Sequence, residues 1–222
     1  MPTESDAAIE ITAYSWVPPF ARGLVRDFRI RWVLEEAALP YRVKLYDRRT
    51  SGPEERQPEQ PFGQVPAFRE GAVRMFESGA ICLHLAERSE ALLPPGEAAR
   101  SRALCWTFAA LNSVEPAILQ MQSVRVFNRD KPGAAEFAPT VEEHLRNRLN
   151  DLQAALGDRE WLEDRFTIGD LLMVSVLRQL KRGRWFADFP RLGAYVDRGE
   201  VRPAFVRAIE AQMADFQEDE AA

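Results

Sequence analysis

The sequence predicts an α/β amino-terminal part with a mixed four-stranded sheet, followed by an all-α helical bundle. Alternating apolar and polar residues, which are typical of strands, occur only before residue 77. The stretch Leu92-Leu93-Pro94-Pro95-Gly96 then resembles a linker, and the chain beyond it shows helical periodicity. We therefore expect one domain over residues 7–90 and an all-helical domain over residues 97–217.

The amino-terminal part begins with a strand, a helix and a second strand. Residues 9–13 and 41–46 alternate in polarity, as half-buried strands do. Between them, apolar residues recur at helical spacing over 21–38, and Pro40 ends this helix by restricting the residue before it. The other expected elements are a loop with a short helix over 48–61, strands over 66–68 and 72–76 joined at Glu70-Gly71, and a helix over 78–89. This order can form a thioredoxin-like sandwich, because the first helix supplies a right-handed crossover.

The carboxy-terminal part reads as a series of helices. A long helical pattern over 97–126 contains Pro116, which we expect to kink the helix. Thr167 and Asp170 have the spacing of a capping box, which predicts the start of an apolar helix over 171–180. The remaining expected helices cover 139–156, 190–197 and 202–216.

Composition argues against several function classes. The 222 residues carry a net charge of −5 without a basic stripe, so we expect no nucleic-acid partner. Cys82 and Cys105 have no second cysteine at metal or redox spacing, and His84 and His144 lie far apart, so we expect no metal site. No apolar run is long enough to span a membrane, and residues 1–6 are unlike a signal peptide. We expect a cytoplasmic protein.

The Val65-Pro66 step is the first candidate site feature. Pro66 begins a strand, where a missing N–H group is tolerated. A cis bond here would turn the Val65 N–H and C=O outwards, free to pair with the backbone of a bound peptide. The alternative is a trans proline on an edge strand without a functional role.

Glu77 and Ser78 form the second feature. Ser78 occupies an N-cap position, where its hydroxyl and the free helix N–H groups attract a carboxylate. Glu77 beside it would pair with an ammonium group. Together they suit the head of an α-amino acid, which carries both charges. The alternative is an ordinary N-cap next to a helix-favouring acid.

With these motifs on one chain, the sequence resembles the cytosolic (soluble) glutathione S-transferase family, bacterial type. In that family, the residue before a cis-proline pairs with the cysteinyl part of glutathione, and an acid-Ser pair holds the γ-glutamyl head. The resemblance assigns these roles to Val65, Glu77 and Ser78, with Pro66 as the proline and Gln64 as a neighbour. The motifs that carry the resemblance are Gly63-Gln64-Val65-Pro66, Glu77-Ser78-Gly79-Ala80-Ile81, Arg31-Trp32-Val33-Leu34-Glu35-Glu36, Leu39-Pro40-Tyr41 and Phe166-Thr167-Ile168-Gly169-Asp170.

The chain departs from the family at the thiolate position. Family members place a Tyr, Ser or Cys near the start of the first helix, but residues 20–26 contain neither a hydroxyl nor a thiol. Ser15 is our first candidate for stabilising the sulfur and Arg22 the second, through its charge; Tyr14 remains open. Tyr14 could instead belong to the core, and Arg22 to the surface.

The resemblance implies a homodimeric glutathione transferase. It would transfer the thiol of glutathione to a small apolar electrophile, or use it to reduce a peroxide. The alternative that the missing hydroxyl leaves open is a non-catalytic protein of the same fold, which binds glutathione or other ligands. Glutathione is the expected co-substrate, and no metal is expected.

Overall fold

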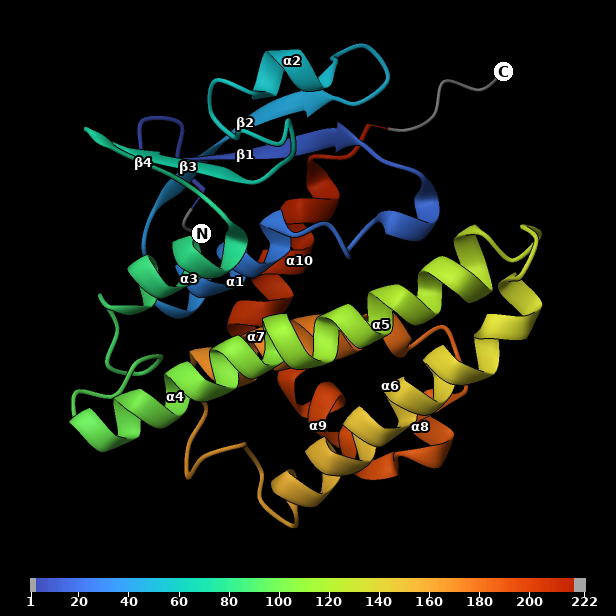
Figure 1. The fold of residues 1–222 in the computed structure, drawn as a ribbon. Helices are drawn as coiled ribbons and strands as arrows, with labels where there is room; N and C mark the ends of the chain where they lie inside the picture. Colours follow the sequence, from blue (N-terminus) through green and yellow to red (C-terminus); the bar gives the residue numbers. More distant parts are fainter. Residues whose placement is uncertain (1–2, 218–222) are drawn as a thin grey trace. The chain divides into compact units, whose positions relative to one another are not determined.

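The computed structural model describes residues 3–217, which divide into two compact units. The described residues up to Leu93, together with those from Glu200 onward, form the first unit, and Pro94–Gly199 form the second. Figure 1 follows the chain through both. In residues 3–217, no helix is both long and apolar enough to cross a membrane.

The first unit is built on the expected mixed four-stranded sheet, in the order β2-β1-β3-β4. β1 (Ile9–Trp16) pairs in parallel with β2 (Tyr41–Asp47) and antiparallel with β3 (Ala67–Glu70), which pairs antiparallel with β4 (Val73–Phe76). Gly71 turns the β3–β4 hairpin at a φ of +56°, which glycine adopts without steric cost. The alternating residues of β1 bury Ile9, Ile11 and Ala13, as their spacing predicts.

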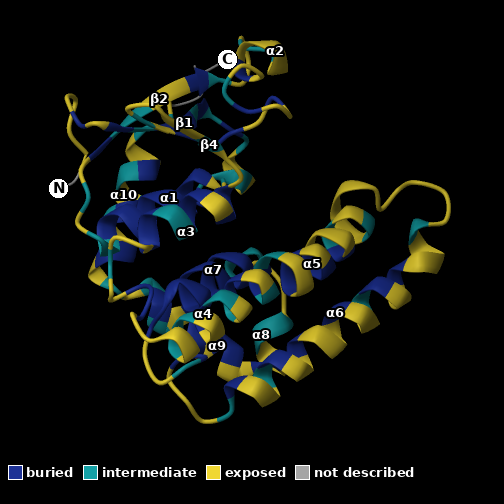
Figure 2. Ribbon diagram, turned by 60° about the vertical axis from the view of Figure 1, so that its left-hand side comes forward, coloured by how far each residue is buried: buried dark blue, intermediate teal, exposed yellow. Residues whose placement is uncertain are grey.

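Helices α1 (Asp27–Glu36), α3 (Ser78–Ala86) and α10 (Pro203–Ala214) lie on one face of this sheet, and α2 (Pro53–Arg56) lies on the other (Figure 1). The interior positions of α1 and α3 are buried (Figure 2). The expectation that the first helix begins at residue 21 is wrong, because Pro19–Ala21 form a 3₁₀ turn and Gly23 has a φ of +79°. The chain therefore becomes α-helical only at Asp27.

The last helix packs within the first unit, although the sequence pattern groups it with the helical domain. Phe205 of α10 contacts the rings of Phe28 and Trp32 in α1 at centroid distances of 5.1 and 5.0 Å. The buried guanidinium of Arg31 forms ion pairs with Asp27 and with Asp215. These contacts attach the end of the chain to α1, while the domain limits of 7–90 and 97–217 remain predictions.

The second unit is helical, as predicted. Pro116 lacks the N–H group that would continue an α-helical ladder, and a π-helical segment over Ala110–Val114 lies at this point. The expected start of a helix at residue 139 is wrong: the helix begins at Ala134 and includes Pro139. The helices of this unit are α4 (Glu97–Ala109), α5 (Glu115–Gln122), α6 (Ala134–Leu156), α7 (Ile168–Leu177), α8 (Trp185–Asp188) and α9 (Pro190–Glu200).

The predicted capping box starts α7. Thr167 is the N-cap, and its amide donates to Asp170 Oδ2 at 2.9 Å. The other oxygen of Asp170 accepts from the Leu162 amide at 2.8 Å and the Tyr195 hydroxyl at 2.9 Å. Burial raises the pKa of Asp170, against the lowering effect of these hydrogen bonds. This motif is structural, since its carboxylate is fully occupied inside the second unit.

Candidate functional site

A buried arginine, Arg56, holds the loop that precedes the third strand. Arg56 donates through Nε to the Gly63 carbonyl at 2.8 Å and through Nη1 to the Ser51 carbonyl at 3.2 Å. Its guanidinium also lies over the rings of Tyr14 and Tyr46, at 5.4 and 5.8 Å from their centroids. One side chain thus attaches both ends of the 51–63 loop to the sheet.

Gln60 and Gly63 fix the conformation of the turn that follows. The buried Gln60 side chain accepts through Oε1 from the amides of Phe62 at 2.7 Å and Gln64 at 3.1 Å. Gly63 has a φ of +65°, and a Cβ atom there would lie 2.6 Å from the Cβ of Pro53. The turn therefore fixes the backbone at Gln64, whose side chain is exposed.

The Val65–Pro66 peptide bond is cis. β3 begins directly after it, where the Ala67 amide donates to Thr12 Oγ1 at 2.7 Å. Within residues 3–217, the amide and carbonyl of Val65 have no hydrogen-bond partner. They are available to pair with the backbone of another peptide.

Glu77 and Ser78 lie at the start of α3, one position from where the sequence suggested. The N-cap is Glu77 rather than Ser78, and it has a φ of +68°, which is uncommon for a residue with a side chain. Its carboxylate is exposed and makes no ion pair within residues 3–217. The Ser78 hydroxyl is buried and accepts from Nη1 of Arg29 in α1 at 3.3 Å.

The sheet brings these residues together. Ile11 is opposite Phe68 in the β1–β3 ladder, and Ala67 is opposite Phe76 in the β3–β4 ladder. If both registers are continued two residues past Ala67, Val65 lies between the end of β1 and Ser78. Val65, Glu77 and Ser78 therefore lie at the same end of the sheet.

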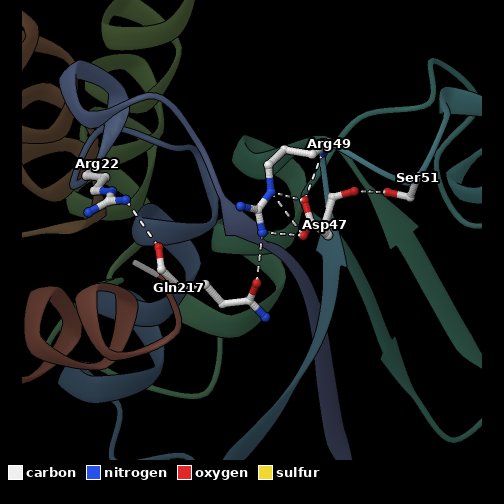
Figure 3. Close-up of polar contacts among 5 residues, drawn as sticks. All are labelled: Arg22, Asp47, Arg49, Ser51 and Gln217. Atoms are coloured by element: carbon white, nitrogen blue, oxygen red, sulfur yellow. Dashed lines mark hydrogen bonds and ion pairs between the residues drawn. The ribbon is translucent and has the colours of Figure 1, made fainter. Parts of the chain in front are cut away.

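The two residues that we expected at the sulfur differ in their surroundings. Ser15 is buried near the end of β1, with 4% of its surface exposed. Arg22 points to the carboxy-terminal segment and donates through Nη2 to the Gln217 carbonyl at 3.2 Å (Figure 3). Arg22 Nε is buried, and no acceptor lies within hydrogen-bond reach among the described residues. Within residues 3–217, this N–H group is thus an unused donor in the β1–α1 loop.

The two thiols are unequal. Burial raises the pKa of Cys82 to about 12, against a smaller lowering effect of Arg29, so this thiol remains protonated at neutral pH. Cys105 is exposed on α4 of the second unit. Across residues 3–217, no cluster of three His, Cys, Asp or Glu side chains could hold a metal ion.

The sequence interpretation missed the residues that support the site. Arg29 and Arg56 read as ordinary charged positions of a helix and a loop, but both are buried. Gln60 carries a weak signal, because a glutamine before Pro61 can accept from the following turn. Gln217 carries no signal, since its contacts to Ser15 and Arg22 are made by its main chain.

Three comparisons with known proteins found similar sequences and a similar fold. Residues 11–87 match the family model "Glutathione S-transferase, N-terminal domain". The chain is 28% identical over 198 residues to glutathione S-transferase 3 of Zea mays, covering 82% of this chain and 88% of that protein. It is 28% identical over 206 residues to the disulfide-bond oxidoreductase YfcG of Escherichia coli K12, covering 86% and 94%.

A solved structure has the same fold. It is that of a glutathione transferase family member from Pseudomonas fluorescens Pf-5 with two glutathione molecules bound. It superposes with a TM-score of 0.79 at 22% sequence identity, and covers 91% of this chain and 92% of its own.

Proposed function

We propose that the chain is a member of the glutathione S-transferase family, and that it binds glutathione at Gln64, Val65, Pro66, Glu77 and Ser78 and activates its thiol. The observation that carries the proposal is the exposed, unpaired Glu77 carboxylate beside the Ser78 hydroxyl within residues 3–217.

Glu77 and Ser78 suit the γ-glutamyl head of the peptide. The α-ammonium group pairs with the Glu77 carboxylate. The α-carboxylate accepts from the Ser78 hydroxyl and the first N–H groups of α3, where the helix dipole favours a negative charge. Arg29 donates to Ser78 Oγ, which leaves the hydroxyl proton available for the ligand.

Val65 receives the middle of the peptide. Its amide and carbonyl pair antiparallel with the cysteinyl backbone, which extends the sheet by one short segment. Gln64 lies next to this segment with its side chain exposed. The turn held by Arg56 and Gln60 keeps these groups in place before the ligand arrives, so little conformational entropy is lost on binding.

The thiol chemistry belongs to the β1–α1 loop. Ser15 donates a hydrogen bond to the sulfur, and the positive charge of Arg22 lowers the thiol pKa. In conjugation, the thiol loses its proton, the sulfur forms a bond to an electrophilic carbon, and a halide or similar group leaves. With a peroxide, two glutathione molecules are oxidised to the disulfide while the peroxide becomes an alcohol and water.

The proposal extends to the setting of the reaction. We propose a homodimer in the cytoplasm that detoxifies small apolar electrophiles. The alternative is a glutathione-binding protein without turnover, and one observation favours it: residues 20–26 contain neither a hydroxyl nor a thiol. The name of the Escherichia coli relative adds disulfide reduction to the activities that require testing.

Replacing Ser78 with Ala tests the binding site. A hydrogen bond to a charged group contributes about 1.5–3 kcal/mol, so the Kd for glutathione should rise roughly 10- to 150-fold. Ser101→Ala, at an exposed position of α4, is the control. Isothermal titration calorimetry measures both, and an unchanged Kd in Ser78→Ala would remove this residue from the site.

Glu77 is tested with a matched ligand. Glu77→Gln should weaken the binding of glutathione but not of an analogue that lacks the α-amino group. Equal losses for both ligands would contradict the ammonium contact.

Turnover is tested with three substrates: a reactive aryl halide, an organic hydroperoxide and a mixed disulfide of glutathione. Glutathione binding without turnover of any of them would support the non-catalytic alternative.

A further inference from the structure

A single residue, Gln217, bridges the end of β1 and the middle of the β1–α1 loop. The Gln217 amide donates to the Ser15 carbonyl at 2.8 Å, and the Gln217 carbonyl accepts from Arg22 Nη2 at 3.2 Å. Figure 3 shows Gln217 between Arg22 and Arg49. The two candidate thiolate residues are therefore connected through one peptide segment.

The contact with Ser15 falls where β1 departs from regular pairing. Tyr14 is opposite Tyr46 and Trp16 is opposite Asp47, so Ser15 is an extra residue without a partner on β2. Such bulges re-aim a side chain, and the bulged residue is left out of the ladder. The Gln217 amide supplies the donor for this unpaired carbonyl, and thereby holds the backbone that carries the Ser15 hydroxyl.

The side chain of Gln217 adds a third attachment. Its Oε1 accepts from Arg49 Nη2 at 3.0 Å, and Arg49 also pairs with Asp47 at the end of β2 (Figure 3). The guanidinium carbon of Arg22 lies over the ring of the preceding Phe216, 5.8 Å from the ring centroid. The segment thus contacts the end of β1, the loop before α1 and the loop after β2.

The segment is anchored by the helix before it. Asp215 pairs with the buried Arg31, whose Nε donates to Asp27 at 2.8 Å. Gln212 of α10 donates to the other oxygen of Asp27 at 2.8 Å. Removing one partner of such a buried network is costly, so the position of residues 215–217 relative to α1 is strongly specified.

We propose that Gln217 is a positioning residue, which orients Ser15 and Arg22 toward the sulfur of bound glutathione. This inference rests on the proposed function. Gln217 acts through its main-chain N–H and C=O groups: the first holds the Ser15 bulge, and the second holds one arm of the Arg22 guanidinium. Misplacement of a catalytic group by about 1 Å lowers a rate up to a hundredfold, so this contact bears on turnover.

Two truncations test the proposal. Ending the chain after Phe216 removes all contacts of Gln217, whereas ending it after Gln217 keeps them, because the new terminal carboxylate still accepts from Arg22. Both lack the acidic residues 218–220, so the difference between them reports Gln217 together with the position of the new terminal carboxylate. We expect kcat to fall roughly 10- to 100-fold only in the shorter chain, with the KM for glutathione changed by less than about threefold.

A pH titration separates positioning from a purely structural role. In the chain ending at Phe216, the pKa of the bound glutathione thiol, followed by thiolate absorbance, should move upward. Equal kcat and equal thiol pKa in the two truncations would overturn the proposal. Gln217→Ala lacks only the Arg49 contact, whereas Gln217→Pro lacks both that contact and the N–H donor to Ser15, so the difference between them reports the donor. Gln217→Pro should reproduce part of the loss, and Gln217→Ala should have a smaller effect.

Hydrogen exchange keeps the two proposals distinguishable. Loss of amide protection over residues 15–26 in the chain ending at Phe216 would support the bridging role. If the full chain also failed to bind glutathione, that failure would refute the proposed function but not the bridging role. Unchanged protection would refute the bridging role while leaving glutathione binding at Glu77 and Ser78 intact.

Discussion

The turn before the cis-proline offers a direct test of how the loop positions the site. Gly63 and Gly71 both have positive φ angles, of +65° and +56°, in the same unit. A Cβ atom at Gly63 would lie 2.6 Å from the Cβ of Pro53 and 2.9 Å from its carbonyl oxygen, whereas at Gly71 no atom lies within 4 Å. Replacing each glycine with Ala therefore separates backbone strain from a steric clash.

The magnitudes follow from these distances. In Gly71→Ala, the left-handed conformation alone costs about 1–2 kcal/mol. Gly63→Ala carries the same cost, and its carbon–carbon overlap with Pro53 adds overpacking of about 1–3 kcal/mol. We expect losses in the free energy of unfolding of about 1–2 kcal/mol for Gly71→Ala and about 2–5 kcal/mol for Gly63→Ala.

The two variants should also differ in ligand binding. Relief of the clash moves the chain that leads to Gln64 and Val65, so the Kd for glutathione should rise at least about tenfold in Gly63→Ala and remain near the parent value in Gly71→Ala. Urea unfolding followed by circular dichroism, and titration calorimetry with glutathione, measure the two effects. Equal stability losses and equal Kd values in the two variants would refute the steric argument.

Two further predictions concern stability and thiol reactivity. Asp170→Ala leaves buried donors such as the Tyr195 hydroxyl unpaired, so it should destabilise the protein by about 3–5 kcal/mol in urea unfolding. The control, Asp164→Ala at an exposed position, should change stability by less than about 0.5 kcal/mol. A small loss in Asp170→Ala would contradict the capping-box argument. At pH 8, iodoacetamide should label Cys105 but not Cys82 until urea is added. Because folding raises the pKa of Cys82 from 9.0 to about 12, its contribution to stability is complete below pH 9 and is lost as the pH rises toward 12; labelling of Cys82 in the native protein would contradict its burial.

The sequence predicted the parts of the fold that depend on local chemistry. The alternation of polar and apolar residues located the strands, and Gly71 located the hairpin. Thr167 and Asp170 located the start of α7. The pairs Val65-Pro66 and Glu77-Ser78 were recognisable because each needs particular residue types at adjacent positions.

Other features could be recognised only in the tertiary structure. The helical spacing over 21–38 could not locate the start of α1 at Asp27, because the positive φ of Gly23 depends on how the loop meets its surroundings. The attachment of α10 to α1 requires Arg31 and Asp215, which lie 184 residues apart.

The sequence by itself predicted the binding half of the candidate site, since the Val-Pro step and the acid-Ser pair each consist of adjacent residues. The tertiary structure decided what surrounds Ser15 and Arg22. Their bridge is made by the backbone of Gln217, and every residue other than proline carries the same N–H and C=O groups. A contact of that kind leaves no pattern in the sequence, because it depends on where the chain runs rather than on which side chain it carries.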